Sequence, residues 1–221
     1  MASPHSHLPR PVAIVFDLDG TLVDTVETRI KAWLDVFDEE GIPADRDQVA
    51  TLIGSDGRRV AREVAADAGI TLEAGRAEAI DARCGDLFAA LNRDPRVLPG
   101  VSPLLARLGK DGMPWAIATS SRREEVAASV DALRLARPPL IVDGTHVAHA
   151  KPAPDLLLLA AKELDANPEA CWYVGDSTWD VKASLAAGMV PIGVTTGAAN
   201  AETLRATGAR RVVASLDELE I

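Results

Sequence analysis

An apolar run near the start of the chain, Val12 to Phe16, leads directly into the polar segment Asp17-Leu-Asp19-Gly20-Thr21. The run is short and contains β-branched and aromatic side chains, which is typical of a strand buried on both faces of a parallel sheet. Ligands of open α/β sheets bind beyond the carboxyl ends of the strands. We therefore expect Asp17 and Asp19 to face a functional site, with Gly20 allowing the chain to turn sharply after them.

A helical pattern replaces the strand pattern after Asp24, with apolar residues recurring on one helical face in three stretches. They predict a helix that begins at Val26 and is ended by Gly41-Ile-Pro43, a second from Arg58 to Ala68, and a third that carries Ile80 to Leu91. No strand is expected between Asp24 and Pro95, and a helical block of about 70 residues is too long for a connecting loop. We interpret residues 24–95 as an inserted helical module.

The alternation of strands and helices resumes after Pro99-Gly100 and continues to the end of the chain. Such alternation predicts an α/β protein whose mostly parallel sheet is covered by helices on both faces. Residues 1–23 and 96–221 would form this core. The further strands are expected at Trp115–Thr119, Leu140–Val142, Cys171–Val174, Pro191–Val194 and Arg211–Val213.

Charge and composition narrow the range of partners. The net charge of -10 and the pI of about 4.9 give the chain no general attraction to nucleic acid or to anionic lipid. The sequence has no run of about 18 apolar residues that could span a bilayer, and the segment Met1–Pro11 lacks the apolar centre of a signal peptide. We expect this segment to be a disordered arm in which His5 and His7 are solvated.

The cysteines indicate a reducing compartment. Cys84 and Cys171 are the two cysteines of the chain, and they do not have the spacing of a metal site. They fall in segments with a helix or strand pattern, so we expect both thiols to be reduced and packed. At 221 residues the chain is long enough for one sizeable core with a smaller inserted module. These features together favour a cytoplasmic globular protein.

Polar side chains that could take part in catalysis or binding follow three more of the predicted strands. They are Thr119 with Ser120 and Ser121, Lys151 in Ala150-Lys-Pro-Ala-Pro154, and Asp176 with Asp180. Each has an ordinary interpretation when taken alone, because hydroxyls and aspartates cap helices and a single lysine is normally solvated. Asp17 and Asp19 likewise have an ordinary interpretation, as an acidic turn after a strand. An EF-hand calcium loop fits less well, since the acids follow a strand rather than a helix.

Taken together, these groups supply what Mg²⁺-assisted phosphoryl transfer requires: a nucleophile, a proton shuttle, a hydroxyl donor, a cation and metal-binding carboxylates. Two carboxylates as close as Asp17 and Asp19 also need a cation beside them, for which Mg²⁺ is the first candidate. A single shared active site explains the polar groups at these four strand ends better than four independent coincidences do.

The four segments resemble the four motifs of the haloacid dehalogenase-like superfamily, in the same order and over the whole chain. They are Asp17-Leu-Asp19-Gly-Thr-Leu-Val-Asp24, Thr119-Ser120, Lys151-Pro-Ala-Pro-Asp155 and Gly175-Asp176-Ser-Thr-Trp-Asp180. The position of the helical module resembles that of the first type of cap in the superfamily's phosphatases, among them those similar to phosphoglycolate phosphatase and β-phosphoglucomutase. This resemblance implies a Rossmann-like core with a helical cap. Asp19 favours phosphate esters, because the true dehalogenases lack this aspartate and the phosphonate hydrolases replace it with a small residue.

The resemblance also implies roles for the acidic residues. Asp17 would be the nucleophile that forms an aspartyl phosphate, and Asp19 would protonate the leaving alcohol and later take a proton from water. Mg²⁺ would be held by Asp17, Asp176 and the backbone carbonyl of Asp19. Asp180 would hold Lys151 from outside the metal shell, with a water-mediated metal contact as the alternative.

The transferring phosphoryl group has its own implied partners. Thr119 and Lys151 would neutralise and orient it, assisted by backbone N–H groups near Asp19, Gly20 and Ser120. The cap would select the ester, and its candidate reading loop is Gly54-Ser-Asp-Gly57-Arg58-Arg59. Arg58 would meet a polar or anionic substrate there; a helix start with solvated arginines is the alternative.

We therefore expect a Mg²⁺-dependent phosphatase of small phosphorylated metabolites such as sugar phosphates or phosphoglycolate-like esters. Neither nucleic acid nor membrane is an expected partner, and the protein would act as a monomer or homodimer. Two alternatives stay open. A phosphomutase would return the phosphoryl group to its substrate, and a regulatory module would bind phosphate without turnover.

Overall fold

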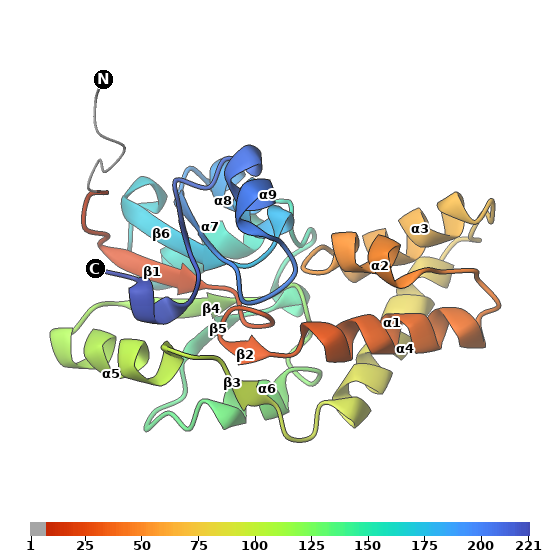
Figure 1. Ribbon diagram of the computed structural model, residues 1–221, viewed down its shortest axis with the longest axis horizontal. Helices are drawn as coiled ribbons and strands as arrows, with labels where there is room; N and C mark the ends of the chain where they lie inside the picture. The colour runs from red at the N-terminus through yellow and green to blue at the C-terminus, as the bar shows by residue number, and fades with distance from the viewer. Residues whose placement is uncertain (1–7) are drawn as a thin grey trace.

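The computed structural model describes residues 8–221, so His5 and His7 lie outside the described residues. Its main sheet has six parallel strands in the order β5-β4-β1-β6-β7-β8 (Figure 1). The strands confirm the sequence predictions to within one residue at either end. They are β1 (Ala13–Phe16), β4 (Trp115–Ala118), β5 (Leu140–Val142), β6 (Cys171–Gly175), β7 (Val190–Val194) and β8 (Arg211–Val213).

Helices cover both faces of this sheet, as predicted. The alternation along β1 places Ile14 and Phe16 in one apolar cluster with α5, and Ala13 and Val15 in another with α7. The helices of this part are α5 (Val101–Asp111), α6 (Ala127–Ala132), α7 (Asp155–Glu163), α8 (Thr178–Ala187) and α9 (Ala201–Thr207), with short 3₁₀ turns at Gly144–His146, Pro168–Ala170 and Leu216–Glu218. The result is a Rossmann-like α/β core.

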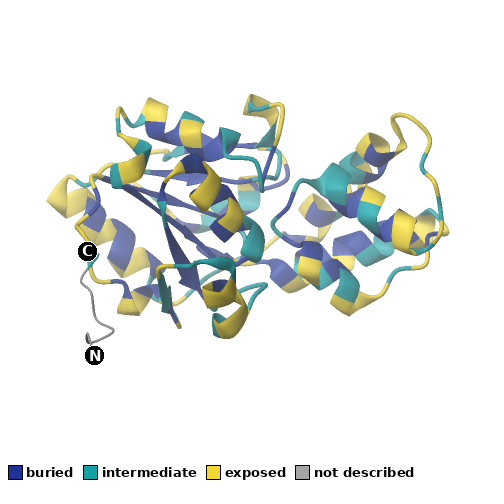
Figure 2. Ribbon diagram, turned by 90° about the horizontal axis from the view of Figure 1, so that it is seen from above, coloured by how far each residue is buried: buried dark blue, intermediate teal, exposed yellow. Residues whose placement is uncertain are grey.

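The inserted segment forms a separate group of helices beside the carboxyl ends of the strands. These helices are α1 (Val26–Glu39), α2 (Arg46–Leu52), α3 (Gly57–Asp67) and α4 (Arg76–Leu91). Their inward faces share one apolar cluster of their own, visible as the buried faces of the helical lobe in Figure 2. The sequence prediction missed α2. That helix buries only Val49 and Leu52, too few positions to show a helical period.

A two-stranded antiparallel ribbon joins the helical group to the core. It pairs β2 (Val23–Asp24) with β3 (Arg96–Val97), which the sequence analysis did not predict because each strand has two residues. The ribbon stands where the chain leaves the core and returns to it. We propose that it marks the boundary between an α/β core of residues 1–23 and 96–221 and a helical cap of residues 24–95.

Two smaller expectations concern the cysteines and the membrane. Cys84 and Cys171 are buried and unbridged, which confirms that both are packed as free thiols. Burial raises the pKa of the Cys84 thiol to about 12, so this group has no reactive thiolate near neutral pH. Within residues 8–221, every helix is too short or too polar to cross a bilayer.

Candidate active site

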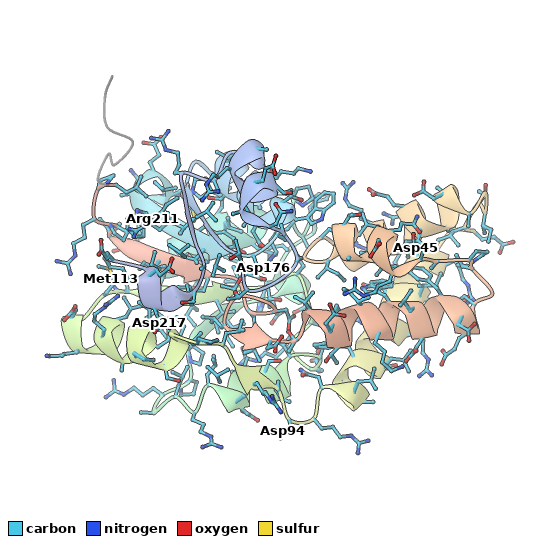
Figure 3. All side chains as sticks on the ribbon, viewed as in Figure 1. Asp45, Asp94, Met113, Asp176, Arg211 and Asp217 are labelled. Carbon is cyan, nitrogen blue, oxygen red and sulfur yellow. The ribbon has the colours of Figure 1, made fainter. Side chains whose placement is uncertain are left out.

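The four predicted motifs meet in one cavity between the core and the cap. It encloses about 60 Å³ at the carboxyl ends of β1, β4 and β6. Figure 3 shows Asp176 at this junction, between the sheet and the cap helices α1 and α2. Of the predicted residues, the cavity is lined by Asp17, Asp19, Thr119, Ser120, Lys151 and Asp176.

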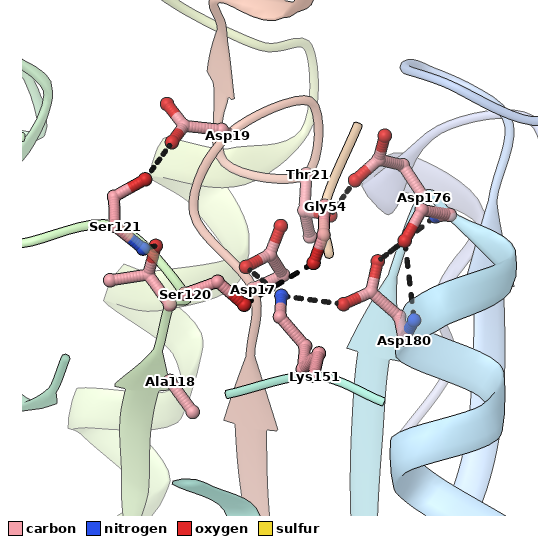
Figure 4. Close-up of polar contacts among 12 residues, drawn as sticks. Asp17, Asp19, Thr21, Gly54, Ala118, Ser120, Ser121, Lys151, Asp176 and Asp180 are labelled. Atoms are coloured by element: carbon pink, nitrogen blue, oxygen red, sulfur yellow. Dashed lines mark hydrogen bonds and ion pairs between the residues drawn. The ribbon is translucent and has the colours of Figure 1, made fainter. Parts of the chain in front are cut away.

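Lys151 forms the buried centre of the site. Its Nζ lies 2.7 Å from Asp17 Oδ1 and 2.7 Å from Asp180 Oδ1, as Figure 4 shows. The sequence alone also allowed an ordinary solvated lysine at this position. The structure contradicts that interpretation, because Lys151 is fully buried. Burial alone would lower the pKa of Lys151, but the two carboxylates outweigh it and raise the pKa above its ordinary value. The ammonium group is a permanent cation beside Asp17.

Tyr173 and Ser177 fix Asp180 from the core side. The Tyr173 hydroxyl donates to Asp180 Oδ1 over 3.1 Å, and the backbone N–H of Ser177 donates to Asp180 Oδ2 over 2.9 Å. Ser177 and Asp180 form the capping box that begins α8. Asp180 thus holds Lys151 by a carboxylate whose own position is set by the start of a helix. Asp176 is not the helix cap, since Ser177 takes that position.

Asp176 is held by a hydroxyl and a backbone N–H. Thr21 Oγ1 donates to its Oδ1 over 3.1 Å, and the N–H of Ala198 donates to its Oδ2 over 2.6 Å. Two glycines give the carboxylate room. A Cβ at Gly20 would lie 2.5 Å from Asp176 Oδ2, and one at Gly197 would lie 2.0 Å from it. Gly20 also has a φ of +79°, which favours glycine independently.

The acids of the site fit a bound divalent cation. Asp17, Asp176 and Asp180 are buried, and one ligand oxygen from each lies within 4.8 Å of the others. Three carboxylates against the single ammonium of Lys151 leave two uncompensated negative charges. Burial raises the pKa of the Asp17 carboxyl well above its ordinary value, and burial followed by the charge of Asp180 raises that of Asp176 to about 7. A divalent cation would balance the two charges, and oxygen ligands are what Mg²⁺ prefers.

Donors for an anion are available beside Asp17. The Thr119 hydroxyl is buried and accepts the N–H of Ser121 over 3.2 Å. Within residues 8–221 it donates to no other group, and the backbone N–H groups of Asp19 and Ser120 likewise have no acceptor. Asp19 and Ser120 are half-buried, so these donors lie at the cavity and are available to an anion that enters it.

Asp19 points toward the cap side of the cavity rather than toward Lys151. Thr25 Oγ1 donates to its Oδ1 over 2.6 Å, and its Oδ2 lies 3.5 Å from Arg29. The Ser121 hydroxyl donates to the same Oδ2 over 3.4 Å, as Figure 4 shows. The two aspartates of the first motif therefore face different halves of the cavity. Asp17 faces the buried cation, and Asp19 faces the side where the remainder of a substrate would lie.

Two local predictions differ from the structure. Ser120 and Ser121 do not cap the next helix, since α6 begins only at Ala127. Their hydroxyls are used instead across the cavity, where Ser120 donates to the carbonyl of Gly54 over 3.3 Å. Arg58 does not line the cavity that holds Asp17. Its guanidinium donates two hydrogen bonds to Asp56, the N-cap of α3, so the residue lies at a helix start, as in the alternative, but with its side chain paired rather than solvated.

Arg29, Glu125, Arg122 and Asp81 line the cavity and were missed by the sequence analysis. Arg29 is buried on α1, and its guanidinium lies 3.4 Å above the ring of Phe88. It lies 3.0 Å from Glu125, a residue of the opposite wall. Nothing in the spacing of the two residues could have paired them. The one available signal was a charged residue on the apolar face of α1, between Val26 and Trp33.

Comparison with known proteins agrees with this geometry. The family model described as haloacid dehalogenase-like hydrolase matches residues 14–194, a span that contains all four motifs. Hexitol phosphatase A of Escherichia coli (strain K12) is 33% identical over 210 residues, covering 94% of this chain and 92% of its own. β-Phosphoglucomutase of Bacillus subtilis (strain 168) is 31% identical over 199 residues, 84% of each chain.

A solved structure, that of a hydrolase from Pseudomonas syringae, has a TM-score of 0.89 and 30% identity, covering 93% of this chain and 94% of its own. Both the sheet and the helical insertion fall within the matched length. The sequence motifs, their meeting point in the fold and these matches lead to one conclusion: the chain belongs to the haloacid dehalogenase-like hydrolases.

Proposed function

We propose that the protein is a Mg²⁺-dependent phosphatase that hydrolyses monoesters of small phosphorylated metabolites through an aspartyl phosphate on Asp17. The observation that carries the proposal is the buried contact of Asp17 with Lys151, 2.7 Å long, in a cavity with Thr119 and Asp176. The names of the relatives support the reaction class, since hexitol phosphatase A and a phosphoglycolate phosphatase are among them.

Asp17 is the nucleophile of this proposal. Lys151 engages its Oδ1, while Oδ2 receives no hydrogen bond from residues 8–221. An oxygen of Asp17 attacks phosphorus, a new bond forms between them, and the bond from phosphorus to the ester oxygen breaks. The electron pair of that bond leaves with the alcohol oxygen.

Asp19 carries the proton in both halves of the reaction. As a carboxylic acid it gives its proton to the departing alcohol oxygen. The resulting carboxylate then takes a proton from water as the water attacks phosphorus, and the bond between phosphorus and Asp17 breaks. The products are the alcohol and inorganic phosphate, and both aspartates return to their starting states.

The donors beside Asp17 orient the phosphoryl group. The hydroxyl of Thr119, the ammonium of Lys151 and the N–H groups of Asp19 and Ser120 surround the position an incoming phosphate would take. Fixed donors of this kind are typically worth about 10²–10³ in rate each. Mg²⁺, held by Asp17, Asp176 and the carbonyl of Asp19, would neutralise charge on the phosphoryl oxygens.

The test measures inorganic phosphate released from a panel of phosphorylated metabolites, with Mg²⁺ and with a chelator. Wild type and Asp17→Asn are compared, because the amide has nearly the shape of the carboxylate but cannot act as the nucleophile. Release that requires both Mg²⁺ and Asp17 supports the proposal. Phosphate release by folded Asp17→Asn at the wild-type rate would contradict it.

The same assay addresses the alternatives. β-Phosphoglucomutase of Bacillus subtilis is among the relatives, so each reaction is also examined for an isomer of the ester. Isomer without phosphate would identify a mutase. A folded protein that binds phosphate esters and changes none of them would identify the regulatory module. The expected cytoplasmic location stays a prediction.

A further inference from the structure

Tyr173 is a buried polar residue that no step of the proposed reaction uses. It lies on β6, three positions before Asp176, and its side chain belongs to the apolar cluster that packs against α7. The neighbouring strands carry the small residues Ala13, Ala116 and Ala118 in this cluster, which leaves room for the ring. The ring extends over β1, so that its hydroxyl reaches the carbonyl oxygen of Ala118 on β4.

The Tyr173 hydroxyl lies where three of the four predicted motifs meet. It is 3.2 Å from the Ala118 carbonyl, 3.1 Å from Asp180 Oδ1 and 3.3 Å from Lys151 Nζ, and Ala118 directly precedes Thr119. A phenol has one proton to donate and lone pairs that accept, whereas an ammonium group can only donate. The hydroxyl therefore accepts an N–H of Lys151, while its own proton is shared between the carbonyl and the carboxylate.

This contact completes the set of acceptors around Lys151. An ammonium group has three N–H donors, and three acceptors within the described residues surround this one. Asp17 Oδ1 and Asp180 Oδ1 each lie 2.7 Å from Nζ, and the Tyr173 oxygen lies 3.3 Å from it. Fixed distances to two acceptors leave the nitrogen free to move along an arc, whereas a third acceptor removes this freedom. The tyrosine supplies that third acceptor, and it is neutral.

Tyr173 reaches Lys151 from inside the core rather than from the cavity. Among residues 8–221, the lining of the cavity includes Lys151 but neither Tyr173 nor Asp180. Tyr173 is only 1% exposed, so a substrate has no access to its hydroxyl. Any influence of this hydroxyl on the reaction must therefore pass through the ammonium group.

We propose that Tyr173 is a positioning residue, whose hydroxyl accepts an N–H of Lys151 and thereby holds the ammonium against Asp17 and beside the incoming phosphoryl group. The effect on turnover rests on the proposed phosphatase function, whereas the contact with Lys151 does not. A misplacement of about 1 Å in an active site can cost about 100-fold in rate. Loss of the hydroxyl should thus lower turnover, although the hydroxyl touches no atom of the substrate.

The ordinary interpretation of the hydroxyl is that it only satisfies its own hydrogen bond. Buried tyrosine hydroxyls usually have a partner, and the Ala118 carbonyl supplies one. In that case the Lys151 ammonium would behave in the same way with or without the hydroxyl. The two interpretations therefore differ in one observable, the mobility of the ammonium group.

The first test measures how fast the Lys151 ammonium protons exchange with water, by nuclear magnetic resonance of isotope-labelled lysine in a chelating buffer. Within the described residues Lys151 is the one buried lysine, so its slowly exchanging signal is distinct. Tyr173→Phe removes the acceptor and keeps the ring. Because hydrogen bonds that involve a charged group are strong, we expect the exchange rate to rise about tenfold or more. An unchanged rate in folded Tyr173→Phe overturns the proposal.

Ser184→Ala is the matched control. Ser184 is also a buried residue whose hydroxyl donates to a backbone carbonyl, that of Met189, over 3.3 Å, and it lies outside the cavity. This variant should leave the exchange of the Lys151 ammonium at the wild-type rate. The backbone amides of β6 report general loosening of the fold. A faster exchange at Lys151 that is matched by an equal rise at these amides overturns the proposal.

The second test measures kcat for a phosphate ester. Tyr173→Phe should lower kcat about tenfold or more, whereas Ser184→Ala should stay within about twofold of wild type. Faster exchange of the ammonium protons without a lower kcat overturns the positioning role and leaves the phosphatase function standing. A wild-type protein that releases no phosphate would reject the phosphatase function, and the exchange rate would then decide whether Tyr173 holds Lys151.

A measurement on the wild type covers the case in which Tyr173→Phe does not fold. Tyr173 is the only tyrosine of the sequence, so an isotope label on tyrosine reports on this residue alone. Inorganic phosphate is titrated in the presence of Mg²⁺, and the backbone N–H signal of Ser120 reports its binding. We expect the tyrosine signal to shift with the same dissociation constant, because the phosphate and the hydroxyl share the ammonium as a donor. A tyrosine signal that stays constant while the Ser120 signal moves overturns the proposal.

Discussion

The indole nitrogen of Trp179 donates a hydrogen bond to the carbonyl oxygen of Thr51 over 2.9 Å. Trp179 lies between Asp176 and Asp180 in the core, whereas Thr51 belongs to the cap helix α2. Arg59 of the cap is also placed over the indole ring, 5.4 Å from its centroid. The first turn of α8, which carries Asp180 and follows Asp176, is thus hydrogen-bonded directly to the cap.

Replacing Trp179 with phenylalanine should weaken the closed arrangement of cap and core. The variant keeps an aromatic ring for Arg59 but loses the donor to Thr51. One hydrogen bond is worth about 0.5–1.5 kcal/mol, so we expect KM for a phosphate ester to rise by roughly two- to tenfold. Steady-state kinetics measures this rise.

Trp115→Phe is the control, since Trp115 lies on β4 outside the cavity, and it should leave KM unchanged. An unchanged KM in Trp179→Phe would show that the contact does not contribute to closure.

Lys151→Met should destabilise the fold as well as abolish turnover. The substitution leaves Asp17 and Asp180 buried without their shared cation, and removing one partner of a buried ion pair costs about 3–5 kcal/mol. Urea unfolding at neutral pH in the presence of a chelator measures the loss. Lys162→Met, at an exposed lysine of α7, should change the free energy of unfolding by less than about 0.5 kcal/mol.

A second substitution tests the cause of that loss. If the uncompensated acids are responsible, adding Asp180→Asn to Lys151→Met should recover part of the stability, because one buried charge disappears. The recovery is obtained from a double-mutant cycle. Equal stability of the single and double variants would indicate that lost packing of the lysine stem, rather than charge, dominates.

Gly197→Ala should weaken metal binding without breaking the fold. The added Cβ would lie 2.0 Å from Asp176 Oδ2, so the carboxylate has to move. Displacing a group that orients a ligand typically costs 10–100-fold in metal affinity, and we expect the Mg²⁺ concentration for half-maximal activity to rise by about tenfold or more. Gly109→Ala is the control, because a Cβ there meets nothing within 4 Å. A normal Mg²⁺ requirement in Gly197→Ala would argue against Asp176 as a ligand.

The sequence was sufficient for the parts of this protein that depend on local pattern. The buried strand Ala13–Phe16 and the polar residues at the strand ends follow from hydrophobic period and from the rule that parallel strands end at one edge. Lys151 and Asp17 are 134 positions apart, yet each follows the end of a predicted strand, so the topology brings them together. The resemblance to known motifs then assigned their expected roles.

The contacts that the sequence analysis missed depend on how the helical cap packs against the α/β core. Arg29 and Glu125 are 96 positions apart, and their contact exists only because α1 approaches the segment before α6. No periodicity describes such a contact. Arg58 shows the converse case, since a cation in a glycine-rich loop suggested substrate contact while its side chain is used locally by Asp56. The half of the cavity that is formed between the cap and the core was therefore the part least accessible from the sequence.

Asp81 gives this half of the cavity a measurable pH dependence. Burial raises the pKa of its carboxyl from 3.8 to about 6 in the folded protein, the charge of Arg122 opposing this. Between pH 4 and pH 6 the folded state thus binds more protons than the unfolded state. The stability that Asp81 contributes is fully present below pH 4 and is lost as the pH rises through 6, which amounts to at most about 3 kcal/mol.

Asp81→Asn should remove this dependence, because an amide does not titrate. We expect the variant to gain stability relative to wild type as the pH rises from 4 to 7, by about 1–3 kcal/mol, when both are unfolded by urea in a chelating buffer. Taking the difference between the two proteins cancels the titration of the other acids, which both share. Asp86→Asn should run parallel to wild type over the whole range, since Asp86 is exposed. A constant difference between Asp81→Asn and wild type would mean that the Asp81 carboxyl is well solvated in the folded protein and that burial does not raise its pKa.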